Sequence, residues 1–384
     1  MADDAVTETE AWLRIAAAPG LGAARLEPLL TACGSAAELV AAAHSTAALG
    51  RAGVDSSALP DEATRRALTD PEARLLDPAL EWLAASTEHR LLTWGDPAYP
   101  SLLREIPDPP VLLFVAGQLA AISELQLAVV GSRNPTPAGR ENAREFARHL
   151  AGCGLTITSG LARGVDGAAH RGALEAGGDT IAVCGCGLDR IYPPAHADLA
   201  VDIIDRGALV SEFFPGTPPR RENFPRRNRL ISGLSLGVLV VEAGLRSGSL
   251  ITARLAGDQG REVFAIPGSI HNPLARGCHQ LLRQGARLVE SGADVLSELG
   301  ALAAAGLAAP DPAGAAAEPP PATPTEEPDP AYQALLEALG YEPVTAEILV
   351  QRTGLTAAEV SSMLLILELQ GRLESGPGGR YTRI

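Results

Sequence analysis

Lysine is absent from this 384-residue chain, so all 31 of its basic residues are arginine. This absence excludes a Walker A phosphate loop, a Schiff base on a lysine amine and a Ser-x-x-Lys catalytic pair. The five cysteines contain no Cys-x-x-Cys pair, which argues against a zinc site and a disulfide framework and fits a reducing compartment. Cys184 and Cys186 follow an apolar run and are expected to be buried thiols. We therefore expect neither a metal ion nor another cofactor.

Long apolar runs are missing as well. No segment reaches the roughly 18 apolar residues that a membrane helix needs, and the acidic start MADDAVTETE lacks the apolar core of a signal peptide. We therefore expect a cytoplasmic protein without membrane contact. The chain is too long for one ordinary hydrophobic core, which predicts two or three domains.

The net charge of −15 looks unsuited to a nucleic-acid partner, but the charge is unevenly distributed. Residues 1–70 hold 5 arginines and 10 acidic residues, and residues 301–384 hold 4 and 11. Residues 71–300 are nearly balanced, with 22 arginines and 25 acidic residues, and the segment from Arg220 to Arg229 holds five arginines and one acid. Because local patches decide binding to a polyanion, the middle of the chain can carry a basic face.

Apolar strands alternate with helices over residues 73–300. A lead-in over residues 73–125 contains an expected strand from Val111 to Val115, and seven apolar segments follow, from QLAVVG to ARLVE. Near-continuous apolar strands separated by helices are typical of a parallel sheet that is covered on both faces. The predicted fold is therefore α/β, with an extended Rossmann-like, doubly wound parallel sheet.

Other parts flank this sheet on both sides. Residues 1–72 predict short helices of a helix-hairpin-helix or SAM-like unit, in which Pro19-Gly20-Leu21-Gly22 either presents backbone N–H groups to phosphate or is a plain tight turn. Residues 301–330 predict a linker rich in Pro, Ala and Glu, and residues 331–384 predict a winged-helix-like unit. Its expected recognition helix, Thr356 to Gln370, has glutamates but no arginine, so a protein-contact or structural role is favoured over a DNA groove.

Three loops are expected at the carboxyl ends of the strands, the edge where open α/β sheets bind ligands. Glycine lets a ligand approach the backbone, arginine grips phosphate with two N–H groups, and a helix start offers free N–H donors. One such loop alone is often a plain tight turn, but three on one edge predict a phosphate-binding rim. The loops are Gly131-Ser132-Arg133, Ser159 to Asp166 and Ser247-Gly248-Ser249.

A segment rich in proline and arginine carries Phe224. Its prolines are expected to keep it non-helical up to Arg226, which leaves Phe224 on a loop. An aromatic ring beside Arg226, Arg227 and Arg229 is typical of a stacking platform for unpaired bases. The alternative is core packing of the ring beside a solvated run of charge.

Four titratable residues leave further alternatives open. Asp166 and His170 are four residues apart on an expected helix and form either a catalytic dyad or a buried pair that holds the loop. Glu212 and Glu242 each end an expected strand and serve either as acid or base or to orient neighbouring arginines. The GLSLG string lies between a helix and a strand, the reverse of the order that a serine hydrolase requires, which excludes that class.

A series of strings carries a family resemblance: AVVGSR, TSGLARGVDGAAH, CGCGLDRIYPPAH, LVSEFFPG, NFPRRNRLISGLS and VLVVEAGLRSGSLITARLAG. In order and spacing, from about Trp94 to Leu299, they resemble the DNA-processing protein A family, called DprA or Smf. The N-terminal helices and the C-terminal winged-helix-like unit also resemble the flanking domains of that family.

The resemblance implies a cytoplasmic recombination mediator and not an enzyme. Such proteins bind and protect single-stranded DNA that enters during natural transformation, load the RecA recombinase onto it and form homodimers through the Rossmann-like domain. Carried over by motif, the residues expected to bind DNA are Gly131, Ser132, Arg133, Ser159, Gly160, Arg163, Phe224, Arg226, Arg227, Asn228, Arg229, Ser247, Gly248 and Ser249. The family often has lysine among its basic residues, whereas this chain uses arginine alone.

A different class of protein shares this kind of sheet. Enzymes that process nucleoside monophosphates, such as phosphoribohydrolases, have a similar Rossmann-like fold. In that alternative, Glu242 and Asp166 would supply the acid and the base.

Overall fold

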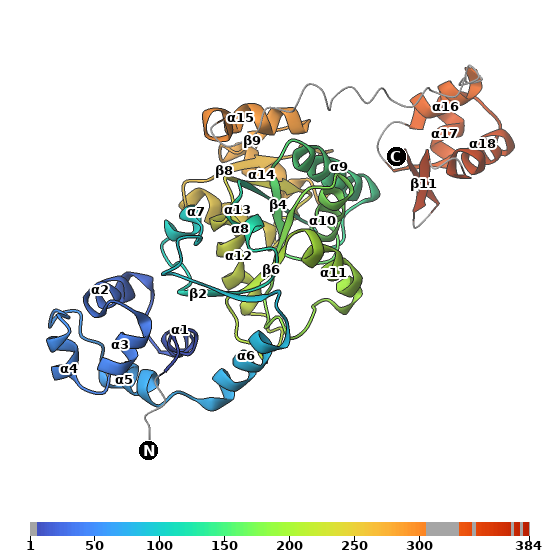
Figure 1. The fold of residues 1–384 in the computed structure, drawn as a ribbon. Coiled ribbons are helices and arrows are strands. Elements are labelled where there is room, and N and C mark those ends of the chain that lie inside the picture. The colour runs from blue at the N-terminus through green and yellow to red at the C-terminus, as the bar shows by residue number, and fades with distance from the viewer. Residues whose placement is uncertain (1–5, 305–329, 340–342, 370–371, 377–378, 384) are drawn as a thin grey trace.

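The computed structural model describes residues 6–304, 330–339, 343–369, 372–376 and 379–383. In chain order it consists of a group of short helices, a large central sheet covered by helices, and a small C-terminal unit of helices and strands (Figure 1). The predicted linker lies largely outside the described residues.

The first unit is built from short helices whose starts are fixed by polar side chains. Ser35, Ser45 and Asp61 each accept a hydrogen bond from a backbone N–H group in the turn that follows, the usual form of an N-terminal cap. The predicted turn from Pro19 to Gly22 joins the first two helices. The helices are α1 (Glu8–Ala17), α2 (Ala23–Cys33), α3 (Ala36–Ala42), α4 (Thr46–Arg51), α5 (Glu62–Thr69) and α6 (Ala73–Ala85).

A nine-stranded sheet forms the centre, in the order β1-β2-β6-β5-β4-β3-β7-β8-β9. Its strands are β1 (His89–Thr93), β2 (Leu112–Gly117), β3 (Gln126–Gly131), β4 (Thr156–Ser159), β5 (Thr180–Val183), β6 (Ala208–Ser211), β7 (Gly237–Val241), β8 (Glu262–Ala265) and β9 (Arg287–Leu288). From β3 to β9 every pairing is parallel, which confirms the predicted α/β class.

The sheet is not parallel throughout, and here the prediction was incomplete. β2 pairs antiparallel with β6, and β1 pairs antiparallel with β2. The lead-in therefore extends the sheet instead of only packing on it. β1 escaped prediction because its HRLLT sequence buries only its last two residues and so lacks the long apolar run that marks the other strands.

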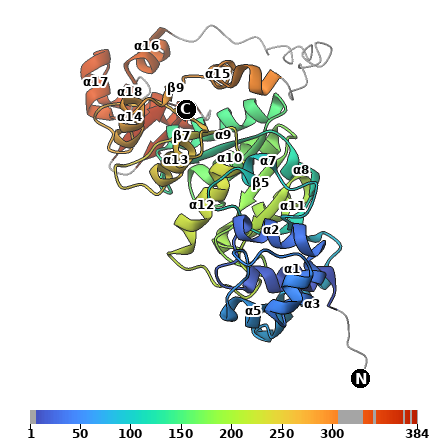
Figure 2. The ribbon, with the colours of Figure 1, turned by 90° about the vertical axis from the view of Figure 1, so that its left-hand side faces the viewer.

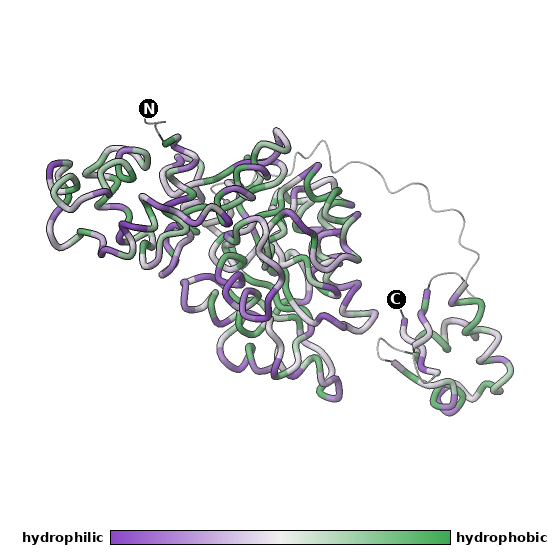
Figure 3. Tube along the Cα trace, turned by 90° about the horizontal axis from the view of Figure 1, so that it is seen from below, coloured by the Kyte–Doolittle hydropathy of each residue, from purple (hydrophilic) through white to green (hydrophobic). Residues whose placement is uncertain are grey.

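Helices cover both faces of the sheet, as Figure 2 shows. Because alternate strand residues point to opposite faces, Leu127 and Val129 of β3 pack with α9, α10 and α15, whereas Ala128 and Val130 pack with α12, α13 and α14. In Figure 3 the hydrophobic segments run through the interior of this unit. The helices are α7 (Ser101–Arg104), α8 (Ala120–Ser123), α9 (Pro137–Gly152), α10 (Val165–Glu175), α11 (Ala197–Arg206), α12 (Asn223–Gly233), α13 (Ser249–Asp258), α14 (Arg276–Arg283) and α15 (Gly292–Ala304).

The chain reverses direction across the sheet between β3 and β7. From β3 it moves outward through β4, β5 and β6, and it then returns to place β7 on the other side of β3. Open α/β sheets bind ligands at such a switch point, at the carboxyl ends of the strands. Gly131 pairs with Val241 there, and a Cβ at residue 131 would lie 1.8 Å from the Val241 carbonyl oxygen, so only glycine allows this approach.

Over its described residues, the C-terminal unit has three helices and a three-stranded sheet in the order β10-β12-β11. Leu335, Leu349, Val360 and Leu367 are buried in a core of its own, and β11 and β12 pair antiparallel. No helix of the described residues is long and apolar enough to cross a membrane. The elements are α16 (Pro330–Leu339), β10 (Val344–Thr345), α17 (Ala346–Thr353), α18 (Ala357–Leu369), β11 (Leu373–Gly376) and β12 (Arg380–Arg383).

Candidate nucleic-acid interface

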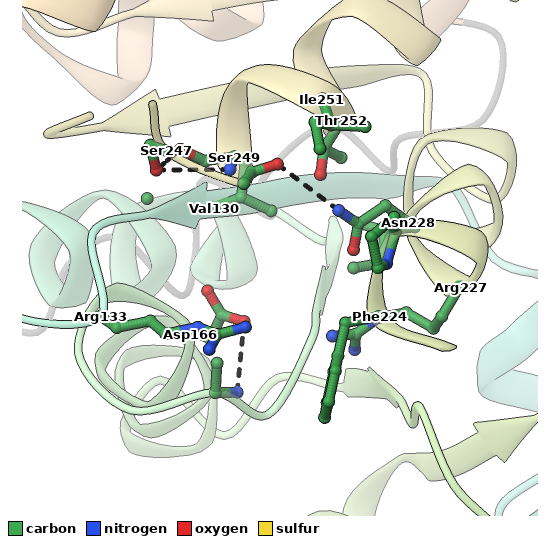
Figure 4. Close-up of a pocket in the computed structure, with 15 residues that line it drawn as sticks. Val130, Arg133, Asp166, Phe224, Arg227, Asn228, Ser247, Ser249, Ile251 and Thr252 are labelled. Carbon is green, nitrogen blue, oxygen red and sulfur yellow. Dashed lines mark hydrogen bonds between the residues drawn. The ribbon is translucent and has the colours of Figure 1, made fainter. Parts of the chain in front are cut away.

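A cavity of about 410 Å³ opens at the switch point. Figure 4 shows Arg133 and Asp166 on one side of it, Phe224 and Arg227 on the opposite side, and Ser247 and Ser249 along a third. Three loops and the start of α12 therefore meet here. The lining residues are Val130, Gly131, Arg133, Ala162, Asp166, Phe224, Pro225, Arg227, Asn228, Ile231, Ser247, Gly248, Ser249, Ile251 and Thr252.

Part of the predicted site is brought together in this lining and part is not. Among the predicted residues, Gly131, Arg133, Phe224, Arg227, Asn228, Ser247, Gly248 and Ser249 line the cavity. The remaining predicted residues are Ser132, Ser159, Gly160, Arg163, Arg226 and Arg229, which lie outside the lining.

Phe224 lies on a helix and not on the loop that the prolines predicted. It occupies the first turn of α12, which begins at Asn223. Pro225 is tolerated because the N–H groups of a first helical turn have no partner within the helix. The Phe224 ring lies against the backbone of Gly185. A Cβ at residue 185 would be 3.0 Å from Cδ1 of Phe224. The guanidinium carbon of Arg133 is 5.6 Å from the ring centroid, within the range of a cation–π contact.

Arg227 is buried, and only 3% of it is exposed. Its Nη1 atom donates a hydrogen bond of 2.8 Å to the carbonyl oxygen of Gly160 and another to that of Val183. A Cβ at Gly160 would lie 2.6 Å from Nη1 of Arg227 and 2.7 Å from Oδ2 of Asp166. Burial raises the pKa of Asp166, and the charge of Arg227 opposes that rise. Arg227 thus ties α12 to the ends of β4 and β5.

Arg226 and Arg229 are paired with Glu212, which directly follows β6. The Nε atom of Arg226 is 2.9 Å from Oε1 of Glu212, and Arg229 donates to Oε2. The side chain of Arg229 is only 12% exposed. Burial raises the pKa of Glu212, and the two guanidinium groups oppose that rise. The hypothesis that Glu212 orients arginines is confirmed.

The Ser-Gly-Ser turn forms the third wall. The Oγ atoms of Ser247 and Ser249 are 2.7 Å apart, and Nδ2 of Asn228 donates to the Gly248 carbonyl oxygen at 3.5 Å. α13 begins at Ser249, so the start of this helix lies beside the cavity. The N–H groups of Leu250 and Ile251 donate to the carbonyl oxygens of Ser247 and Gly248. Helix starts of this kind favour anionic groups.

Several exposed arginines near this edge lack a carboxylate partner. Arg133, Arg163 and Arg246 are exposed, and no ion pair to any of them occurs within the described ranges. Unpaired guanidinium groups are available to phosphate, whereas those held by Glu212 are largely neutralised.

The expected pairing of Asp166 with His170 does not form. Both side chains are buried, but Oδ2 of Asp166 accepts from the Ala162 N–H and Nδ1 of His170 contacts Oγ1 of Thr180 at 2.7 Å. The Thr180 hydroxyl donates to Ile157, so His170 is the donor in that contact. Helical spacing placed the two residues on one face, but strand β5 offers His170 a closer partner.

Glu242 serves a different cavity. Its carboxylate accepts from the N–H and hydroxyl of Thr136 at 2.7 and 2.6 Å and from Asn272 at 3.2 Å. It lines a cavity of about 480 Å³ with His271 and with Arg380 of β12. Within the part of the chain that the structure describes, no cluster of three or more His, Cys, Asp or Glu residues is arranged to hold a metal ion.

A family model described as DNA recombination-mediator protein A matches residues 90–300, more than half of the chain. This chain belongs to that family. A second model, the DprA winged helix domain, matches residues 319–379 and confirms the predicted winged-helix unit.

Curated relatives match this chain over much of their length. Protein Smf of Escherichia coli K12 is 46% identical over 311 residues, which cover 80% of this chain and 81% of that protein. DNA processing protein DprA of Streptococcus pneumoniae R6 is 50% identical over 203 residues, which cover 53% of this chain and 72% of that protein.

Two solved structures share the fold. The X-ray structure of DNA processing protein A from Streptococcus pneumoniae has a TM-score of 0.63 at 36% identity and covers 76% of this chain and 98% of that chain. DNA processing protein A from Helicobacter pylori, described for its single-stranded DNA binding mode, has a TM-score of 0.50 at 32% identity and covers 55% of this chain and 95% of that chain.

Proposed function

We propose that this protein binds single-stranded DNA without sequence preference in the cavity at the switch point. It protects incoming DNA and loads RecA onto it in the cytoplasm during transformation or recombination. The observation that carries this proposal is the meeting of Arg133, the Phe224 ring and the start of α13 around one cavity. Cationic groups and the positive end of a helix dipole suit a phosphate backbone, and an aromatic ring suits an unstacked base. The relative from Helicobacter pylori, described as binding single-stranded DNA, supports the same assignment.

The test is a salt-dependent titration with oligo-dT and a matched duplex. If about four phosphates are neutralised, the plot of log affinity against log salt should have a slope near −3 for the single strand. Equal affinity for single strand and duplex, or no binding of oligo-dT, would overturn the proposal.

We further propose that the protein is a homodimer through the sheet unit. Leu245, Ile251 and Leu288 are exposed by 56, 40 and 54%, and the first two line a hollow of about 520 Å³ that reaches from α13 to α14. Large exposed apolar side chains in one region are typical of a protein contact. Sedimentation of the wild type and of Leu245→Glu tests this, since only the variant should be monomeric.

The separation of the two candidate acid–base residues supports a binding protein over a nucleotide-processing enzyme. Asp166 lines the Phe224 cavity, whereas Glu242 lines another cavity and is held by Thr136. We expect no free base on incubation with nucleoside monophosphates. Turnover that Glu242→Gln abolishes would reverse this conclusion.

A further inference from the structure

Tyr192 is an exposed aromatic residue that continues the surface of the Phe224 ring. It is 47% exposed, and its ring centroid lies 5.7 Å from that of Phe224, with 44° between the ring planes. Phe224 itself is partly buried against Gly185. No pattern in the string CGCGLDRIYPPAH distinguishes Tyr192 from a core residue.

The loop that carries Tyr192 is held at several points. Nδ1 of His196 donates to the Leu161 carbonyl oxygen at 2.9 Å, which joins this loop to the one after β4. Oδ1 of Asp189 accepts from the Gly216 N–H at 2.8 Å. Oδ2 of Asp189 also lies 2.8 Å from Nη2 of Arg190. This ion pair neutralises the charge of Arg190, which precedes Tyr192 by two positions. A ring that is exposed on a fixed loop binds without a large ordering cost.

The spacing of the two rings decides how a base would bind. Stacked bases lie about 3.4 Å apart, so a base between two rings needs about 7 Å between them. The 5.7 Å separation of Tyr192 and Phe224 leaves no such slot. A base therefore stacks on the free face of Tyr192, next to the Phe224 cavity, and not between the two rings.

We propose that Tyr192 is a second stacking platform, which takes the unpaired base next to the one that Phe224 takes. The inference rests on the proposed single-stranded DNA binding and extends the DNA path beyond the cavity. Arg163 is exposed, has no ion pair within the described residues and follows Leu161 by two positions. A guanidinium group is thus present on the loop that supports the platform, where it can accompany the backbone of the same nucleotide.

The test compares Tyr192→Leu, which keeps an apolar side chain without the ring, with Tyr192→Phe, which keeps the ring. Affinity for fluorescent oligo-dT is measured by anisotropy. We expect Tyr192→Leu to bind about tenfold more weakly, as for the loss of one stacked base, and Tyr192→Phe to bind as the wild type does.

An abasic scan separates stacking from a loop defect. Oligo-dT with one abasic residue at successive positions, in a length that fixes the register, should show two positions that weaken binding to the wild type. In Tyr192→Leu, an abasic residue at one of these two positions should weaken binding no further. In Phe224→Leu, the same should hold at the other position. If both positions keep their full cost in Tyr192→Leu, or if Tyr192→Leu binds as tightly as the wild type, the Tyr192 proposal is overturned. Failure of the wild type to bind any oligo-dT would instead overturn the proposed function.

Discussion

Nη1 of Arg227 lies 2.8 Å from the carbonyl oxygen of Gly160 and donates a hydrogen bond to it. One arginine side chain therefore joins α12, which carries Phe224, to the loop between β4 and α10. Within a run of four residues with three arginines, Arg227 positions the site while its neighbours face solvent or Glu212.

The burial of Arg227 predicts that its loss is mainly a loss of stability. Arg227→Ala should lower the free energy of unfolding by about 3 kcal/mol, because it leaves the carbonyl oxygens of Gly160 and Val183 buried without their donor and removes the nearby charge that favours ionised Asp166. Arg133→Ala should change it by less than about 0.5 kcal/mol, because Arg133 is exposed. Urea unfolding measures both. An Arg227→Ala variant that unfolds like the wild type but binds DNA poorly would make Arg227 a direct contact instead.

The ring of Phe224 should contribute to DNA affinity. Phe224→Ala should weaken binding of oligo-dT by about 1–3 kcal/mol, the usual contribution of one stacked base. Phe224→Trp should retain the affinity, because it retains an aromatic face. Anisotropy titrations at fixed salt measure this, and wild-type affinity in Phe224→Ala would contradict the stacking role.

Arginines without an ion pair are expected to bind phosphate, whereas arginines already paired with a carboxylate are not. Removal of Arg133 or Arg163 should reduce the magnitude of the log–log salt slope by about 0.7 each. The matched control is Arg148→Ala. Because Arg148 is already paired with Glu145 on α9, its removal should leave the slope unchanged. A slope that falls equally in all three variants would indicate general electrostatics and not a defined path.

The burial of His170 predicts that the protein loses stability in mild acid. Burial lowers its pKa to about 3, and its Nε2 atom is buried without a hydrogen-bond partner among the described residues. The unfolded chain takes up the proton below about pH 6.5 and the folded chain does not, so stability that is present above this pH is lost as the pH falls towards 3. The slope is at most about 1.4 kcal/mol per pH unit from this residue. His170→Leu should show a shallower decline in urea unfolding between pH 6 and 4, and identical slopes would contradict the assignment.

The strands from β3 to β7 could be predicted because each is a short apolar run between turn residues, and parallel strands are buried on both faces. The rim could be predicted in outline, because glycine-containing loops after such strands share one edge. The roles within the run of arginines were missed, although a signal was present. Had α12 been expected to begin at Asn223, helical spacing would have placed Arg227 beside Leu230 and Ile231 on the buried face.

Other features follow from contacts that no local pattern encodes. The pairing of Glu212 with two arginines joins the end of β6 to α12, and the pairing of His170 with Thr180 joins α10 to β5. Tyr192 meets Phe224 only because its loop lies beside the start of α12, which is distant in the sequence.

The buried residues of the N-terminal helices, among them Trp12 and Leu39, form one cluster with Phe114 and Leu209 of the sheet, whereas the C-terminal unit keeps a cluster to itself. The two ends of the chain therefore differ in how separable they are. Removal of the last unit would leave the hydrophobic clusters of the sheet intact, but it would open the cavity that Glu242 and Arg380 line. The first helices, in contrast, share a hydrophobic core with the sheet. A shortened chain that lacks them would expose Phe114 and Leu209 of the sheet to water and would be insoluble.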